Sequence, residues 1–80
     1  MDDQQVLSTI ARLTEEEHEL EKSHQGEPLT VGKLERLESI RVSLDQCWDL
    51  LRQRRARRES GLDPDGASAR PTEVVEGYEQ

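Results

Sequence analysis

The residues best suited to metal chemistry are Glu15 and His18, which stand three positions apart. Glu-x-x-His on a helix is the spacing with which di-iron carboxylate bundles hold their metal ions. On a helix, however, both side chains point almost opposite to Leu13 and Leu20, which belong to an apolar stripe. The second half of the chain offers no matching Glu-x-x-His. We therefore interpret Glu15 and His18 as part of a solvated charged face, and we predict neither a metal site nor a cofactor.

Cys47, the single cysteine, is the other group that could react. It lies between Leu44 and Leu51 on a second apolar stripe, and a thiol buried in apolar surroundings has a raised pKa and is inert. His24 is expected near the opposite end of the molecule, so no base is close. We interpret Cys47 as a core residue. Because no nucleotide-binding glycine pattern or nucleophile–base pair is present either, we predict that the chain is not an enzyme.

The most distinctive feature is a cluster of arginines whose directions spread around a helix. Its members are Arg52, Arg54, Arg55, Arg57 and Arg58. Three interpretations remain open. The arginines could form a solvated helix end, where the helix dipole favours cations. They could contact an acidic protein surface or the acidic tail of the same chain, or they could bind phosphate or RNA, for which guanidinium geometry is suited.

Composition limits the chain to one small domain and to a few classes of function. Its 80 residues are 31% hydrophobic and 36% charged, with a formal net charge of -7. This acidity opposes nucleic acid as a default partner. No apolar run approaches the roughly 20 residues that span a bilayer, and the acidic start is unlike a secretory signal. A single thiol suits a reducing compartment, so we predict a cytoplasmic protein with no membrane contact.

Two long amphipathic helices must position these residues, and we expect them over about 3–24 and 31–60. Asp2 and Gln5 form a pattern like a capping box at the first start. Thr30 is the expected N-cap of the second helix. Because the loop between them is short, the helices should run antiparallel. The predicted fold class is therefore all-α, a two-helix antiparallel hairpin.

The last part of the chain changes in character. Gly, Asp, Pro, Ser and Ala dominate residues 61–69, which is a linker composition. We expect residues 61–80 to form a flexible, largely disordered tail, with a short helix near 71–78. Val75 and Tyr78 would share one face of that helix, and they are candidate partner-binding residues.

The apolar stripes define a predicted core. Its members are Val6, Ile10, Leu13, Leu20, Leu37, Ile40, Leu44, Cys47, Trp48 and Leu51. Trp48 is assigned to this core or to a dimer interface, and the alternative is an exposed binding anchor. The stripe of the second helix is wider than one narrow helix can cover. We therefore expect a homodimer that forms a four-helix bundle.

One ion pair is expected across the hairpin. If the loop centres near Pro28, facing residues have numbers that sum to about 56, and Glu17 then lies close to Arg41. A polar position in an apolar seam costs stability but selects the alignment of the helices. We predict a Glu17–Arg41 pair that sets the register; the alternative is that Glu17 is a catalytic carboxylate.

Several segments together form a recognisable pattern: Asp45-Gln46-Cys47-Trp48-Asp49 within the run 44–58, Glu16-Glu17-His18, Asp63-Pro64-Asp65, and Arg70-Pro71 followed by Val74-Val75-Glu76-Gly77-Tyr78. On these residues the chain resembles an uncharacterised small actinobacterial protein family, the domain of unknown function 2630. Lys33-Leu34-Glu35 departs from that pattern, in which an acidic–histidine pair is expected. The resemblance covers nearly the whole chain. It implies a cytoplasmic bacterial protein of this size and implies no activity.

These observations favour a non-enzymatic protein–protein interaction or regulatory module. Asp45, Asp49, Gln53 and the arginines would form one polar contact surface, and the segment 74–78 would form a second. The alternative is an RNA- or ribosome-associated factor that binds through the segment 52–58. Aromatic residues that could stack on single-stranded bases are missing from that segment, which weakens the alternative.

Overall fold

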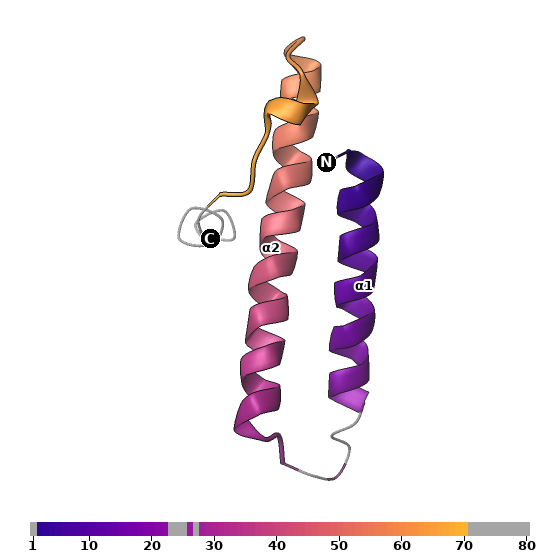
Figure 1. Cartoon of the computed structure of the whole chain (residues 1–80), viewed down its shortest axis with the longest axis vertical. Helices are drawn as coiled ribbons and strands as arrows, with labels where there is room; N and C mark the ends of the chain where they lie inside the picture. The colour runs from indigo at the N-terminus through magenta and orange to yellow at the C-terminus, as the bar shows by residue number, and fades with distance from the viewer. Residues whose placement is uncertain (1, 23–25, 27, 71–80) are drawn as a thin grey trace.

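The computed structural model describes residues 2–22, 26 and 28–70 as an antiparallel helical hairpin (Figure 1). Helix α1 spans Asp3–Lys22, helix α2 spans Val31–Glu59, and a short 3-10 helix, η1, spans Pro64–Gly66. Figure 1 shows α1 and α2 side by side, with η1 turned back against the C-terminal end of α2. The predicted hairpin fold is confirmed. The expected short helix near 71–78 lies outside the described residues, as do Val75 and Tyr78.

Both helices begin at the caps that the sequence predicts. The backbone N–H of Gln5 donates to Asp2 Oδ1, and the backbone N–H of Asp2 donates to Gln5 Oε1, each over 2.8 Å. This reciprocal pair is a capping box. At the start of α2, Thr30 Oγ1 accepts from the backbone N–H of Lys33 over 3.2 Å. Side-chain groups thus satisfy backbone donors that have no partner inside either helix.

Helix α2 ends in a Schellman motif, one residue before the expected position. Gly61 adopts a φ of +77°, which a residue without a Cβ atom reaches at little cost. The backbone N–H of Leu62 then donates to the carbonyl of Arg57 over 2.7 Å, and that of Gly61 to Arg58 over 3.2 Å. The chain therefore reverses sharply after α2. Helix α1 is described as far as Lys22, and the expected end near residue 24 lies outside the described residues.

The fully apolar core between the helices is small. Among the described residues, the buried hydrophobic side chains are Val6, Ile10, Leu13 and Ile40. Five others from the predicted core are half-buried: Leu20, Leu37, Leu44, Cys47 and Leu51. Trp48 is 49% exposed, so its assignment to the core of the hairpin is wrong. It lies at the edge of the seam, because the slender α1 covers only part of the wide apolar stripe of α2.

Residues 61–70 fold back along α2, although their composition predicts a flexible linker. Gln53 Nε2 donates to the carbonyl of Ser68 over 2.7 Å, and Gln46 Nε2 to the carbonyl of Arg70 over 3.3 Å. Side-chain hydrogen bonds from α2 therefore hold this segment. The reason is tertiary, since the donors lie 15 and 24 positions earlier in the chain. Neither described helix is long and apolar enough to cross a membrane.

Candidate functional site

Arg54 is buried at the meeting point of α1, α2 and η1. Its side chain is only 7% exposed. Arg54 Nε donates to Asp3 Oδ1 over 2.5 Å, and Nη1 donates to Asp65 Oδ1 over 2.9 Å. These hydrogen bonds lower the pKa of Asp3 and of Asp65. Arg54 therefore links three segments of its own chain, and it is not available as the partner-binding residue that the sequence suggested.

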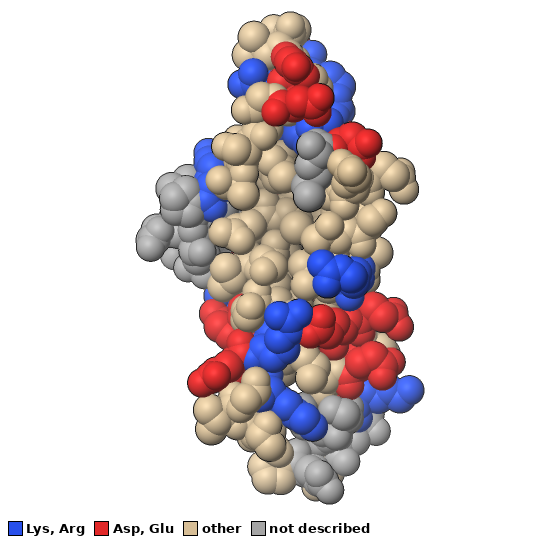
Figure 2. All heavy atoms as spheres, viewed as in Figure 1, with Lys and Arg blue, Asp and Glu red and all other residues tan. Residues whose placement is uncertain are grey.

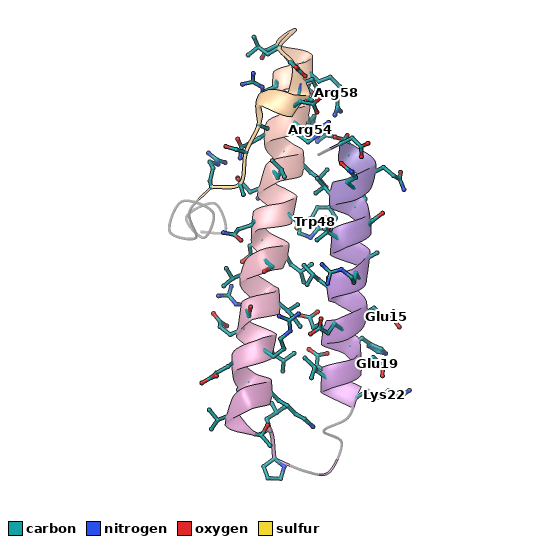
Figure 3. The ribbon with its side chains drawn as sticks, viewed as in Figure 1. Glu15, Glu19, Lys22, Trp48, Arg54 and Arg58 are labelled. Carbon is teal, nitrogen blue, oxygen red and sulfur yellow. The ribbon has the colours of Figure 1, made fainter. Side chains whose placement is uncertain are left out.

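Arg57 and Arg58 also bond to groups of the same chain. Arg58 Nη2 donates to both carboxylate oxygens of Asp3, over 2.9 and 2.8 Å. Arg57 Nε donates to the carbonyl of Asp63 over 2.6 Å. Figure 3 shows Arg54 and Arg58 at the end of α2, beside the N-terminal end of α1. Three of the five arginines thus stabilise this end of the hairpin. The interpretation in which all five form a solvated helix end does not apply to these three.

Arg52 and Arg55 are exposed, and they border a groove at the same end of the molecule. The groove has a volume of about 380 Å³. We call it the Trp48–arginine groove, and it is lined by Asp3, Trp48, Leu51, Arg52, Arg55 and Arg58. Trp48, Arg52 and Arg55 follow one another at steps of four and three, so they share one face of α2. The sequence alternative in which Trp48 is an exposed anchor therefore fits this geometry.

The contact that holds Arg55 is weak. Its Nε lies 3.9 Å from Glu59 Oε1, and the two side chains are 76% and 73% exposed. Exposed pairs at this spacing contribute little to stability, because water competes for both charges. Arg55 can therefore exchange Glu59 for a carboxylate of a partner at little cost.

Asp49 is the charged residue whose role the sequence analysis missed. It is completely buried, and Arg70 binds both of its carboxylate oxygens, with Nε 2.9 Å from Oδ2 and Nη2 bonded to Oδ1. Gln53 Nε2 donates to Oδ2 as well, over 2.9 Å. The hydrogen bonds from Arg70 are the main reason that the pKa of Asp49 lies below its ordinary value, and the hydrogen bond from Gln53 lowers it further. Asp49 and Gln53 thus anchor residues 61–70, and they do not form the contact surface expected of them.

The ion pair across the hairpin differs from the predicted one. Arg36 Nη2 donates to Glu16 Oε1 over 2.8 Å, and Arg36 Nε bonds the other oxygen. Arg41 instead bonds Glu38 Oε1 over 2.7 Å and Asp45 Oδ2 over 3.2 Å, both on its own helix. The predicted Glu17–Arg41 pair is therefore replaced, because carboxylates one turn away already hold Arg41. Glu17 is half-buried in the seam.

The remaining candidates for chemistry are separated in space. Glu15 and His18 are exposed, and Figure 3 shows Glu15 on the side of α1 that faces away from α2. Cys47 is a free, half-buried thiol, and burial raises its pKa. Within the part of the chain that the structure describes, no three His, Cys, Asp or Glu side chains gather in a way that could hold a metal ion.

Comparison with known proteins agrees with the pattern noted in the sequence. The chain belongs to the family described as "Protein of unknown function (DUF2630)", which it matches over residues 2–80. It is 44% identical over 77 residues to uncharacterised proteins of Mycobacterium bovis and Mycobacterium tuberculosis. Each alignment covers 95% of this chain and 88% of the relative. No solved structure matches the chain.

The DUF2630 match extends over every residue that builds the two features above. It includes the Trp48–arginine groove and the contact between Asp49 and Arg70. Neither the family description nor the names of these relatives state an activity.

Proposed function

We propose that this chain is a non-enzymatic interaction module of the cytoplasm, which binds an acidic helical surface of a protein partner in the Trp48–arginine groove. The observation that carries the proposal is the setting of Trp48. Trp48 is 49% exposed on α2, and Leu51, Arg52 and Arg55 line the same groove. Tryptophan and arginine are the residues most enriched among the energetic centres of protein interfaces.

The groove combines an apolar surface with positive charge. Trp48 and Leu51 can cover an apolar side chain of the partner, and removing that surface from water stabilises a complex by about 25 cal/mol per Å². The guanidinium groups of Arg52 and Arg55 can pair with carboxylates around it. Both kinds of contact occur together on a helix with acidic residues beside an apolar stripe.

The paired arginines prepare the groove for binding. Arg54 and Arg58 both bond Asp3, so the first turn of α1 is held against the last turns of α2. Asp3 also lines the groove. A site that is already ordered loses less conformational entropy on binding. The internal ion pairs of this end therefore order the walls of the groove, two of whose lining residues are Asp3 and Arg58.

Trp48 provides a direct test, because it is the single tryptophan of the chain. The probe is a synthetic amphipathic peptide with Glu on its polar face and Leu on its apolar face. We expect it to shift Trp48 fluorescence to shorter wavelength, and we expect Arg52→Gln/Arg55→Gln to weaken binding by roughly tenfold or more. Arg12→Gln removes an exposed arginine elsewhere and should leave the affinity unchanged.

Two outcomes would overturn the proposal. One is a fluorescence signal that does not respond to the peptide, and the other is equal binding by the double variant and wild type.

Single-stranded RNA in the same titration examines the alternative partner. That alternative has less support, because Arg54, Arg57 and Arg58 each bond groups of the same chain. RNA binding in the absence of peptide binding would replace the proposal with it.

A further inference from the structure

Charge is unevenly placed along this molecule, which is 51 Å long. Residues 52–58 place five arginines at one end. The half of α1 next to the loop carries five glutamates, namely Glu15, Glu16, Glu17, Glu19 and Glu21. Figure 2 shows acidic side chains gathered over the half of α1 next to the loop, below an uncharged band. The glutamate-rich half therefore carries an excess of acid, whereas the arginine end is close to neutral as a whole, because Asp3, Asp63, Asp65 and neighbouring acids offset its arginines. The positive charge is local, where Arg52, Arg55 and Arg58 line the Trp48–arginine groove.

We infer that the acidic helical surface bound in the Trp48–arginine groove is the loop end of a second copy of this chain. This inference rests on the proposed function, and it names the partner of the same groove. The two copies lie antiparallel, related by a two-fold axis perpendicular to the helices. Each arginine end then faces the glutamate-rich end of the other copy, so the favourable contact forms twice.

The spacing along the helices fits such an axis at the level of Trp48. Asp3 bonds Arg54 and Arg58, and Glu16 bonds Arg36, so Trp48 lies level with the stretch of α1 around Ser8. Arg55 is seven residues from Trp48 toward one end, which is about 10 Å at 1.5 Å per residue. Glu17 is nine residues from Ser8 toward the other end, which is about 13 Å. A two-fold rotation at Trp48 therefore brings Arg55 of one copy to within one helical turn of the level of Glu17 of the other.

The edge of the seam that carries Trp48 also offers apolar surface for a second copy. The opposite edge has its own groove, which includes Thr9, Arg36 and Leu50. Leu7 is two residues from Thr9, or about 200° around the helix, and so it lies on the Trp48 edge. Leu7 is 45% exposed and Trp48 is 49% exposed. Covering both would extend a core that contains four buried hydrophobic side chains among the described residues.

The experiment is a charge exchange between two variants. Arg52→Glu/Arg55→Glu makes both ends of the hairpin acidic, and Glu17→Arg/Glu21→Arg reverses charge on the loop end. We expect sedimentation velocity to give a mass twice the 9.2 kDa of one chain for wild type. Each variant alone should dimerise at least about tenfold more weakly, and an equimolar mixture of the two should recover dimers. Added salt should weaken the wild-type dimer, because the charges are exposed.

The control is Glu15→Arg/Glu19→Arg, which makes the same charge change on the outer face of α1, where Figure 3 shows both side chains. It should dimerise as wild type does. Recovery in the mixture also demonstrates that both exchange variants fold. A dimer that the Arg52/Arg55 variant leaves intact would overturn the inference. A wild-type chain that stays monomeric while the acidic peptide still binds Trp48 would overturn it too, but would leave the proposed function standing.

Discussion

At the residue scale, the charge pairs of this protein make it sensitive to acid. Arg70 is the main cause of the lowered pKa of Asp49, and Arg54 is the main cause for Asp3 and Asp65. Arg36 does the same for Glu16. Each of these carboxylates binds a proton less readily in the folded protein than in the unfolded chain. Folding is therefore favoured wherever they are ionised.

The sign of the pH dependence follows from these lowered pKa values. The contribution of each acid is complete above its unfolded pKa, which is 3.8 for Asp and 4.5 for Glu, and it is lost as the pH falls through the lower folded value. We expect the free energy of unfolding, measured with urea and circular dichroism, to be level near neutral pH. It should fall below about pH 4.5.

Asp49→Asn is the matched variant for this prediction, because it keeps the shape of a side chain that is completely buried. It should be destabilised at pH 7 and should lose less stability on acidification than wild type. Asp45→Asn, which changes a pair at a partly exposed helix surface, should follow the wild-type curve. A free energy of unfolding that increases as the pH is lowered from 4 to 2 would contradict the assignment of these pairs.

At the element scale, each helix takes its bounds from local groups, whereas its burial depends on its neighbour. The capping box of Asp2 with Gln5, the Thr30 cap and the Gly61 turn all involve residues close in sequence. Such patterns can be recognised without a structure. Ile40 and Trp48 lie on the same predicted stripe of α2, yet one is 0% and the other 49% exposed. Ile40 is buried and Trp48 is exposed because α1 packs over the first residue and leaves the second uncovered.

This difference in burial predicts different costs of truncation along α2. Ile40→Ala should lower the free energy of unfolding by about 2–4 kcal/mol, because it leaves a cavity in place of a completely buried side chain of a small core. Leu34→Ala removes a side chain that is 49% exposed and should cost less than about 1 kcal/mol. Thermal and urea denaturation of dilute protein provide the comparison. Equal losses for the two variants would show that Ile40 does not lie in the shared seam.

At the scale of the whole molecule, a few arginines join segments that are distant in the chain. Arg54 connects Asp3, 51 positions earlier, with Asp65, 11 positions later. Arg70 returns to Asp49 across 21 positions. The arginine end is therefore a tertiary assembly of α1, α2 and η1. The loop end is joined differently, through the exposed pair of Arg36 with Glu16.

Removing the central arginine should loosen one end of the hairpin and spare the other. In Arg54→Gln we expect faster amide hydrogen exchange in the first turns of α1 and in residues 63–67, since both lose their shared partner. Exchange in the half next to the loop should be unchanged. Hydrogen exchange is measured by mass spectrometry for both variants. In Arg12→Gln, the exchange rates should match those of wild type along the whole chain. Uniformly faster exchange in Arg54→Gln would mean that the two ends do not open independently.

Local patterns in the chain were enough to identify two helices, their caps and the antiparallel hairpin. These features depend on helical periodicity and on groups within about one turn of each other. The roles of individual charges were decided by tertiary structure: Arg54 buried, Asp49 held by Arg70, and Glu16 in place of Glu17 as the partner across the seam. Each depends on which long side chain reaches which carboxylate in three dimensions. That reach is set by the packing of α1 against α2 and by the return of residues 61–70.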